Sequence, residues 1–294
     1  MLVNATLAGR LLAAQFPQWG HLAVAPVQPA GTDNAIFRLG PEMTVRFPRA
    51  EPAACHVAKE QRWLAELAPM LPLDIPVPLA QGEPGEGYPW RWSVHRWLDG
   101  APATPGRIAD LADAARRLGD FVAALQRIDP VGGPSWGRHN GFRGQPLAMR
   151  DAETRESIVA LSGSIDADLA ATAWTAALRT PAWTGPGVWL HGDLHPGNVL
   201  AAQGRLAAVI DFGLLATGDP ACDLMVAWTV LTAGTREVFR AAVGVDEETW
   251  ARGRGWALSF ALVALAGYAG TDSPLVPVAH HAISEVLTET DPGE

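Results

Sequence analysis

The sequence predicts an α+β fold of two lobes, with a small β-rich N-terminal lobe at residues 1–98 and a larger, mainly helical C-terminal lobe at residues 99–294. Three observations predict it. Short stretches of alternating apolar and polar residues dominate the first hundred residues, and apolar residues recur every three or four positions after residue 107. Between these regions, glycine and proline cluster at residues 97–106, as is typical of a joint between folding units.

The N-terminal lobe is expected to be a small sheet with a helix packed on it. In order, we expect a helix over 5–16, strands over 35–40 and 43–48, a helix over 52–68, and a strand, a turn and a second strand within 79–100. Within 43–48, Val45 and Phe47 alternate with Arg46. Successive side chains of a strand point to opposite faces, so Arg46 should lie on the face opposite to these two apolar residues.

The C-terminal lobe is expected to be mostly helical, with short strands in its middle. An amphipathic helix over 107–128 is followed by a glycine-rich loop, two helical segments within 146–180, strands over 188–190, 199–202 and 205–210, and helices over 220–233, 235–243, 246–268 and 276–290. The last two strands flank a Gln203-Gly204 turn, so they should form a hairpin.

Composition and charge argue against several classes of protein. Hydrophobic residues make up 48% of the chain and charged residues 18%, as in a globular protein. The net charge of −9 argues against nucleic acid as a partner, because such binding needs a basic surface. We find no membrane-spanning stretch and no signal-peptide pattern, so no membrane partner is expected. Cys55 and Cys222 lack metal-ligand spacing and indicate a reducing compartment, the cytoplasm.

Three oxygen-bearing side chains lie at fixed spacings in "HGDLHPGNVLAAQGRLAAVIDFG", residues 191–213. The expected hairpin should bring Asn198, at its start, beside Asp211, at its end, with Asp193 in the loop just upstream. Oxygen ligands without a His or Cys set suit a hard cation such as Mg²⁺, which takes one or two protein oxygens together with substrate phosphates. Asp193 then suits a base that orients a hydroxyl for attack, as in phosphoryl transfer of the kinase type.

Turn formation is the alternative interpretation of these residues, because Asp and Asn favour turns and helix caps. It would explain each of them alone, but it does not explain why all three flank one hairpin. His195, in the same loop, is interpreted as a packing residue, because Asp193 already supplies the base.

These residues resemble the motifs of a known family. "HGDLHPGN" (191–198) is similar to the catalytic loop of kinases, with Gly192 where arginine is usual, and "IDFG" (210–213) is similar to the metal-binding Asp-Phe-Gly motif. The His-Gly-Asp form, followed by "GDPACDL" (218–224), resembles the aminoglycoside phosphotransferase family. The resemblance implies a protein-kinase-like two-lobe fold and an enzyme, a small-molecule O-phosphotransferase that uses Mg²⁺ and ATP or GTP.

The resemblance also implies a role for each matching residue of the C-terminal lobe. Asp193 would be the catalytic base, and Asn198 and Asp211 would bind Mg²⁺. The supporting residues would be His191, which pins the loop, Gly213 of the Asp-Phe-Gly motif, Asp219, which caps the next helix, and Asp223, which braces the catalytic loop by hydrogen bonds.

In the N-terminal lobe the resemblance implies a set of nucleotide-binding residues. Arg46 would reach the phosphates and Glu60 would pair with it, the backbone of Arg96, Trp97 and Leu98 would bond the adenine edge, and backbone N–H groups around Gly31 and Thr32 would contact phosphates. The family usually has lysine at the position of Arg46, and the one lysine of this chain is Lys59, beside Glu60. We favour Arg46 over Lys59, because its strand position matches and a guanidinium binds phosphate oxygens in a fork; Arg49 is a weaker candidate.

The acceptor should be a small-molecule hydroxyl and not a protein, because the Asp-Phe-Gly motif runs almost directly into a predicted helix. An aminoglycoside, with a role in antibiotic resistance, is the first expected acceptor. As a polycation it needs carboxylates, for which Asp151 and Glu156 are candidates, although a solvated helix face also explains these acids. The alternatives are a macrolide, a small metabolite such as an amino- or sugar-alcohol, and a non-catalytic nucleotide-binding pseudokinase, which the replaced strand lysine keeps open.

Overall fold

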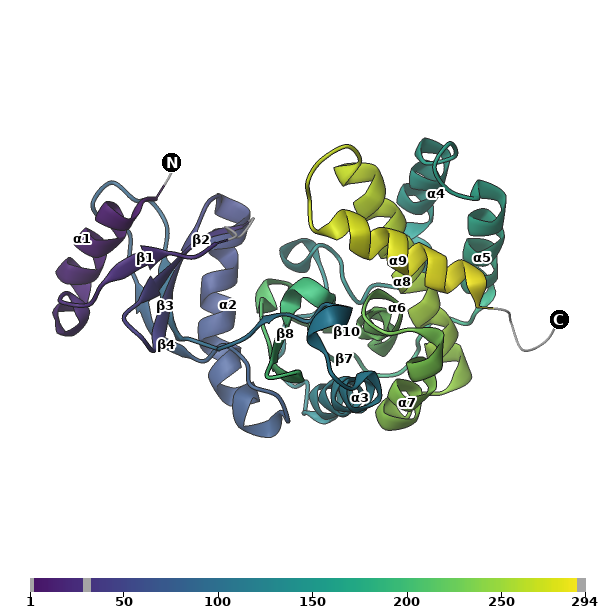
Figure 1. The fold of residues 1–294 in the computed structure, drawn as a ribbon, viewed down its shortest axis with the longest axis horizontal. Coiled ribbons are helices and arrows are strands. Elements are labelled where there is room, and N and C mark those ends of the chain that lie inside the picture. The colour runs from purple at the N-terminus through teal and green to yellow at the C-terminus, as the bar shows by residue number, and fades with distance from the viewer. Residues whose placement is uncertain (1–2, 29–32, 290–294) are drawn as a thin grey trace. The chain divides into compact units, whose positions relative to one another are not determined.

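The computed structural model describes residues 3–28 and 33–289 and divides into two compact units (Figure 1). The first unit consists of the described residues within Met1–Met70 and Asp74–Asp99, together with Asp211–Gly213. The second consists of Leu71–Leu73, Gly100–Ile210 and the described residues from Leu214 onward. An antiparallel sheet is the centre of the first unit and helices dominate the second, which confirms the predicted α+β class with a β-rich and a helical lobe.

The first unit is a five-stranded antiparallel sheet with a helix on each face (Figure 1). In sheet order the strands are β1 (Val24–Pro26), β2 (Asn34–Leu39), β3 (Met43–Pro48), β5 (Trp92–Arg96) and β4 (Pro78–Gly82), and the helices are α1 (Ala5–Gln15) and α2 (Glu51–Leu67). β1 was not predicted, because its three residues are too few to show an alternating pattern.

The two faces of this sheet have different partners. Phe37, Phe47 and Trp92, which come from β2, β3 and β5, belong to the apolar core that α1 covers. The rings of Phe47 and Trp92 stack with centroids 4.9 Å apart. Arg46 lies on the opposite face, where it meets Glu60 of α2. The alternation predicted for 43–48 is therefore what separates an apolar core from a charged cluster.

The second unit is built from helices with two small sheets between them. In chain order its elements are β6 (Ala101–Pro102), α3 (Leu111–Arg127), α4 (Asp151–Ala160), α5 (Ala167–Arg179), β7 (Val188–Leu190), β8 (Val199–Ala202), β9 (Arg205–Val209), β10 (Ala216–Gly218), α6 (Val226–Thr229), α7 (Ala233–Val243), α8 (Glu247–Tyr268) and α9 (Leu275–Thr288). β7 pairs with β10, and β6, β8 and β9 form the other sheet. α8 is buried along most of its length and lies beside α9 (Figure 1).

The segment 220–233 is not the single α-helix that the sequence predicted. Pro220–Met225 form a 3₁₀-helix, α6 covers Val226–Thr229, and Thr232 then caps α7. The apolar pattern was misread, because over six residues it does not distinguish a 3₁₀-helix from an α-helix. β6 and β10 were also missed, because their hydrogen bonds go to strands distant in sequence and two or three residues carry no pattern.

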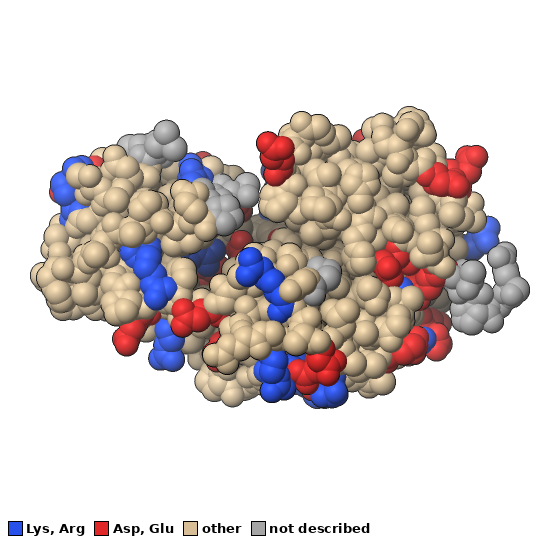
Figure 2. All heavy atoms as spheres, in the orientation of Figure 1, with Lys and Arg blue, Asp and Glu red and all other residues tan. Residues whose placement is uncertain are grey.

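The surface has no single dominant charge on the face shown in Figure 2, where acidic and basic side chains are interspersed. None of the helices within 3–28 and 33–289 has both the length and the apolar character needed to cross a bilayer. Cys55 is exposed and Cys222 is buried, and neither forms a disulfide.

Candidate active site

The loop His191–Asn198 connects β7 to β8 and is held from inside by His191, which is fully buried. Nδ1 of His191 accepts the N–H of Asp193 at 3.1 Å, and the accepted bond assigns the ring proton to Nε2. Nε2 therefore donates to the carbonyl oxygen of Ile210, 2.9 Å away. His191 thus ties the loop to the residue that follows β9.

Asp193 projects from this loop with one carboxylate oxygen held and the other open. Nδ2 of Asn198 donates to Oδ2 of Asp193 at 3.0 Å and to its carbonyl oxygen at 2.9 Å. Oδ1 accepts no hydrogen bond from a described residue, and Nη2 of Arg143 lies 3.9 Å from it. The carboxylate is therefore fixed in direction while one of its oxygens stays available.

Asp193 is ionised at neutral pH. Burial by itself raises the pKa, but the hydrogen bond of His195 and the positive charge of Arg143 outweigh it and lower the pKa of Asp193 to about 2. Such a carboxylate accepts a hydrogen bond from a hydroxyl and orients it, and it takes the proton once the reacting hydroxyl has become strongly acidic.

His195 packs as the sequence suggested and also reaches Asp193. Its ring stacks on Phe260 of α8 with centroids 6.0 Å apart. Nδ1 accepts the N–H of Gly197 at 3.1 Å, so the proton lies on Nε2, which is 3.5 Å from Oδ2 of Asp193. His195 therefore helps to keep Asp193 ionised, a contribution that was not predicted from the sequence.

Gly192 occupies the position where kinases usually have arginine, and its backbone explains the glycine. Its φ of +84° lies in the left-handed region, which side chains disfavour. A Cβ at this position would lie 2.8 Å from the carbonyl oxygen of Leu214 and 3.2 Å from Cβ of Arg143. The absence of a side chain at Gly192 therefore lets Arg143 come close to the loop.

Asp223 supports the loop through two backbone hydrogen bonds. It is fully buried, and its Oδ2 accepts the N–H of His191 at 2.6 Å while Oδ1 accepts that of Gly192 at 2.8 Å. Burial raises the pKa of Asp223 above its usual range, against the lowering effect of His191 and these N–H groups. Both oxygens are used, so this carboxylate fixes the loop and is not available to a substrate.

Asp219 anchors the neighbouring segment. Its Oδ1 accepts the N–H of Ala221 at 3.0 Å and so caps the 3₁₀-helix Pro220–Met225. Its Oδ2 lies 2.9 Å from Nε of Arg252 on α8, and both side chains are almost completely buried. Arg252 also donates to the carbonyl oxygen of Pro181 at 2.9 Å. The cap was predicted from the sequence, but this ion pair was not.

A charged cluster lies within the first unit, on the α2 face of the sheet. Nη1 of Arg46 is 3.3 Å from both carboxylate oxygens of Glu60, and Nη2 is 3.4 Å from Oδ1 of Asp211. Burial alone would lower the pKa of Arg46, but Glu60 and Asp211 outweigh it and raise the value. Burial, and secondarily Arg46, lower the pKa of the adjacent His95 to about 3, so the histidine is neutral. The arginine therefore holds the positive charge of this cluster.

Asp211 follows β9 in a backbone conformation that few residues adopt. Its φ is +65°, a strained value for a residue other than glycine, and its side chain is half exposed. Lys59 reaches the same segment at another atom, because Nζ donates to the carbonyl oxygen of Gly213 at 2.6 Å. Burial lowers the pKa of Lys59 to about 8. Arg46 is thus a cation that contacts both Glu60 and the Asp211 carboxylate.

The donor groups at Asn198 and Asp211 fit a magnesium ion in chemistry. Asn198 uses its Nδ2 toward Asp193, so its side-chain oxygen is the atom left for a ligand, and Asp211 contributes a half-exposed carboxylate. The N–H of Ile210 donates to the carbonyl oxygen of Asn198 at 2.8 Å, and Asp211 is the next residue along the chain. Over 3–28 and 33–289, no three His, Cys, Asp or Glu side chains cluster as metal ligands, so an ion at these oxygens would depend on nucleotide phosphates for its other ligands.

The backbone at 96–98, predicted to bond adenine, has fewer free donors than expected. The N–H of Arg96 donates to the carbonyl oxygen of Val77 at 3.1 Å, and that of Trp97 to the carbonyl oxygen of Glu42 at 2.8 Å. Among the described residues, the N–H of Leu98 has no such acceptor, so Leu98 is the remaining N–H donor of this segment. Gly31 and Thr32, the predicted phosphate contacts, lie outside the described residues.

The predicted acceptor-binding acids both lie on α4, and one is already engaged. Oδ1 of Asp151 accepts hydrogen bonds from Nε of Arg155 at 2.7 Å and from Nε1 of Trp174 at 2.8 Å. Glu156 is exposed. These contacts explain Asp151 as a residue that holds α4 against α5, and they leave it little capacity for a cationic ligand.

A cavity of about 470 Å³ lies next to Asp193, within the second unit. Its lining includes Phe142, Arg143, Met149, Arg150, Glu153 and Val263. We call it the Arg143 cavity, because Arg143 is the lining residue in contact with the Asp193 carboxylate. Arg143 was not predicted from the sequence, because it stands in a glycine-rich loop without a motif; in the structure Gly141, Phe142 and Gly144 around it all have a positive φ.

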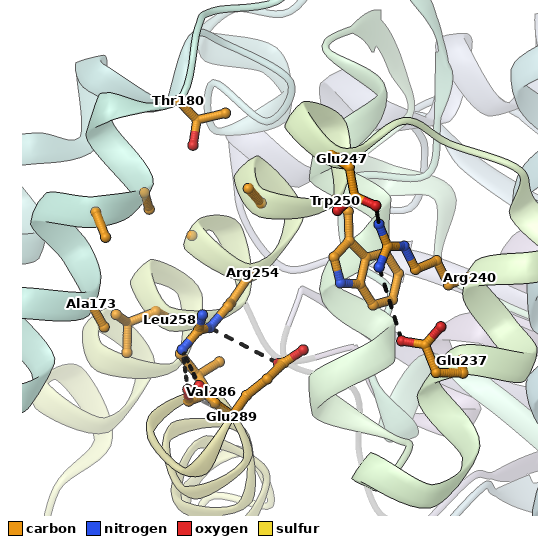
Figure 3. Close-up of a pocket in the computed structure, with 14 residues that line it drawn as sticks. Ala173, Thr180, Glu237, Arg240, Glu247, Trp250, Arg254, Leu258, Val286 and Glu289 are labelled. Carbon is orange, nitrogen blue, oxygen red and sulfur yellow. Dashed lines mark hydrogen bonds and ion pairs between the residues drawn. The ribbon is translucent and has the colours of Figure 1, made fainter. Parts of the chain in front are cut away.

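Another cavity, of about 440 Å³, lies among α5, α7, α8 and α9 (Figure 3). Its charged side chains face one another, with Arg240 paired to Glu247 and Arg254 4.0 Å from Glu289. Trp250 forms part of its apolar wall. None of the residues that the sequence predicted for the active site lines this cavity, so it is not the candidate acceptor site.

Comparisons with known proteins agree with this arrangement of motifs. A family model described as APH, phosphotransferase enzyme family, matches residues 26–256. An uncharacterized protein, YcbJ of Bacillus subtilis (strain 168), is 26% identical over 235 residues, which cover 74% of this chain and 71% of that protein.

Solved structures share the fold over nearly the whole chain. The GDP complex of wild-type aminoglycoside 2'-phosphotransferase-IIIa matches with a TM-score of 0.72 and 18% identity, over 97% of this chain and 99% of the other. The apoenzyme of the macrolide 2'-phosphotransferase MphH from Brachybacterium faecium matches with a TM-score of 0.61 and 23% identity, over 98% and 100%. The kinase-like fold implied by the sequence motifs is therefore confirmed.

Proposed function

The chain belongs to the APH phosphotransferase enzyme family and is thus a small-molecule phosphotransferase, and we propose that it moves the γ-phosphate of ATP or GTP to a hydroxyl group in an Mg²⁺-dependent reaction. The observation that carries the proposal is Asp193, an ionised carboxylate fixed by Asn198 and His195 with Oδ1 free to accept a hydrogen bond.

Asp193 acts on the acceptor in this mechanism. Oδ1 accepts the hydroxyl proton in a hydrogen bond and points a lone pair of the hydroxyl oxygen at the γ-phosphorus. A bond forms between that oxygen and phosphorus, the bond from phosphorus to the bridging oxygen of the nucleoside diphosphate breaks, and the proton passes to Asp193. The low pKa of Asp193 makes orientation its main contribution and proton uptake a late event.

The nucleotide is held by residues of the first unit. Arg46, fixed by Glu60, supplies a permanent positive charge for phosphate oxygens, and the N–H of Leu98 is the donor for the adenine or guanine edge. Asn198 and Asp211 would hold the magnesium ion, which would supply positive charge to neutralise the phosphates. Gly31 and Thr32 remain proposed phosphate contacts through their backbone N–H groups.

The acceptor is a small molecule. After the Asp-Phe-Gly motif the chain enters β10 within a few residues and then the 3₁₀-helix Pro220–Met225, which leaves no long segment to dock a peptide. The solved neighbours are named as aminoglycoside and macrolide phosphotransferases, and both acceptor classes therefore belong in a first screen of substrates.

The test is release of ADP or GDP from the wild-type chain and from Asp193→Ala, with Mg²⁺ and a panel of aminoglycosides, macrolides and small hydroxyl compounds. Removal of the orienting carboxylate should lower kcat by about 10²- to 10⁴-fold, while calorimetry shows unchanged Mg²⁺–nucleotide binding. Asp120→Ala, on an exposed part of α3, is the matched control and should keep wild-type turnover. Turnover of Asp193→Ala within about tenfold of wild type would show that the base is misassigned.

The metal assignment has a separate readout. Asp211→Ala should weaken the binding of Mg²⁺–nucleotide in titration calorimetry, since it removes a proposed ligand and an ion-pair partner of Arg46. If the wild-type chain binds Mg²⁺–nucleotide tightly but no hydroxyl compound stimulates release, the alternative of a non-catalytic pseudokinase replaces the proposal.

A further inference from the structure

The Arg143 cavity has a charge opposite to the one an aminoglycoside needs. Two arginines, Arg143 and Arg150, line it together with a single acid, Glu153. An aminoglycoside is a polycation and is bound by carboxylates. The side chains around the candidate base therefore select a different class of acceptor.

Arg143 is the lining side chain whose hydrogen-bond donors are unused, although its charge lies near the Asp193 carboxylate. Its guanidinium carries five N–H donors, and none of them forms a hydrogen bond to a described residue. Nη1 is buried without an acceptor, Nη2 is 3.9 Å from Asp193, and the guanidinium lies 5.5 Å from the ring centroid of Phe260. A buried donor such as Nη1 that has no acceptor costs free energy, which a bound anion recovers.

The fold fixes Arg143 in this place. Asn140, which is fully buried, donates from Nδ2 to the carbonyl oxygen of Arg143 at 2.9 Å. The carbonyl oxygen of the next residue, Gly144, accepts the N–H of Asp219 at 2.8 Å. Gly192 leaves the space that brings Cβ of Arg143 close to the catalytic loop. These contacts fix the backbone of Arg143 beside the cavity, and 16% of its side-chain surface is exposed.

Arg150 strengthens the positive potential of the same cavity. It is buried, donates from Nε to the hydroxyl of Ser259 at 2.7 Å, and its Nη2 lies 3.2 Å from Glu153, a largely exposed residue. Burial first, and then repulsion by Arg143, lower the pKa of Arg150 to about 10. The two guanidinium groups therefore repel each other, and an anion between them would relieve that repulsion.

We infer that the acceptor carries an anionic group, a carboxylate or a phosphate, a few bonds from the reacting hydroxyl, and that Arg143 binds this group in a forked pair of hydrogen bonds while Asp193 holds the hydroxyl. The distance of 3.9 Å between Nη2 of Arg143 and Oδ1 of Asp193 sets how near the two groups must be. Phe142, Met149 and Val263 offer apolar contacts to the carbon skeleton. This inference rests on the proposed function and specifies its substrate class.

The transferring phosphoryl group is the other anion that Arg143 could bind. The two anions can be distinguished by leaving out the nucleotide. An acceptor anion binds to the nucleotide-free chain, whereas the transferring phosphoryl group is present only when nucleotide is bound. We favour the acceptor, because the cavity also includes Arg150 and apolar side chains, and none of the predicted nucleotide-binding residues lines it.

The experiment compares matched pairs of ligands by titration calorimetry on the nucleotide-free chain. The pairs are glycerate with glyceramide, gluconate with glucose, and glycerol phosphate with glycerol. At least one charged member should bind ten times more tightly than its neutral partner, and Arg143→Gln should reduce this ratio to within twofold. Arg143→Lys keeps the charge without the fork and should retain part of the preference. Arg205→Gln, an exposed arginine paired with Asp113, is the control and should bind like wild type.

Each outcome separates this inference from the proposed function. Equal binding of charged and neutral members in every pair would overturn the inference, even if an aminoglycoside stimulated ADP release. Arg143-dependent binding of an acid that is never phosphorylated would keep the inference and count against the phosphotransferase proposal. A fall in kcat for every acceptor in Arg143→Gln, with unchanged charged-to-neutral ratios, would assign Arg143 to the phosphoryl group instead. If thermal unfolding shows that Arg143→Gln is not folded, the ratios of charged-ligand to neutral-ligand affinity for the wild-type chain and for Arg143→Lys still test the inference.

Discussion

The loop His191–Asn198 contains the half-buried Asp193, the segment Gly218–Leu224 contains the fully buried Asp223, and the two carboxylates behave in opposite ways. The pKa of Asp193 is lowered to about 2, because His195 and Arg143 outweigh burial. The pKa of Asp223 is raised, because complete burial outweighs its two backbone donors. Asp223 uses both oxygens on backbone N–H groups, whereas Asp193 keeps one oxygen open.

This difference teaches how the same residue type takes a reacting or a supporting role. A carboxylate can act on a substrate only if one oxygen is left over after the fold has fixed its direction. A carboxylate whose oxygens are both used can only hold the backbone. The comparison can be tested at three places, in order of decreasing expected effect. They are the Asp219–Arg252 ion pair that anchors the segment Gly218–Leu224, the contact of Asp223 with the loop, and Asp193 itself.

The largest effect is expected at the anchor, where Arg252→Met leaves Asp219 buried without its ion-pair partner. Loss of one member of a buried pair costs about 3–5 kcal/mol of unfolding free energy, measurable by urea denaturation. The double variant Arg252→Met/Asp219→Asn removes both charges and should recover part of the loss. A loss below about 1 kcal/mol for the single variant would show that the segment does not depend on this pair.

A smaller effect is expected where the segment meets the loop. Asp223→Asn keeps one acceptor oxygen but turns an amide NH₂ toward the N–H of His191 or Gly192, so one buried donor loses its partner. We expect a loss of about 2–3 kcal/mol in urea denaturation. Because the loop then shifts Asp193, kcat should fall by roughly 10²-fold in the folded variant. Asp120→Asn, exposed on α3, controls for the change of charge, and an Asp223→Asn enzyme with wild-type kcat would contradict the bracing role.

Much of the fold followed from local patterns in the sequence. Alternation at 43–48 placed Arg46 on a different face from Val45 and Phe47, and the periods of three and four located the long helices. The pattern failed where elements are short: a six-residue 3₁₀-helix looks like part of an α-helix, and β6 and β10 have two and three residues. In those places hydrogen bonds to distant segments, and not local periodicity, decide the structure.

Those site residues that lie in one motif could be predicted from the sequence. Asp193, Asn198 and Asp211 stand within a stretch of about twenty residues, so their spacing was visible, and the resemblance to the family indicated a bracing role for Asp223. The contacts of Arg143 with Asp193, of Lys59 with Gly213 and of Arg252 with Asp219 join residues far apart in the chain. No local pattern records such pairs, which is why Arg143, the residue that we propose binds the acceptor, could be found only in the structure.

The smallest effect is the pH dependence of Asp193. Its folded pKa of about 2 lies below the ordinary value of 3.8, so its favourable interactions are complete above pH 4 and disappear as the pH falls toward 2. The difference corresponds to about 2 kcal/mol of unfolding free energy. We therefore expect wild type to lose about that much more stability than Asp193→Asn between pH 5 and pH 2 in urea denaturation.

Asp223 should show the opposite dependence of unfolding free energy on pH. Because the folded pKa of Asp223 is raised, its protonation at low pH stabilises the folded wild-type chain, and Asp223→Asn should lose this stabilisation. Because the folded pKa of Asp193 is lowered, its protonation at low pH destabilises the folded wild-type chain, and Asp193→Asn should not show this destabilisation. Parallel curves for wild type and Asp193→Asn would mean that His195 and Arg143 do not hold the carboxylate ionised. In that case Asp193 would already be protonated near its ordinary pKa, and it could orient a hydroxyl only at higher pH.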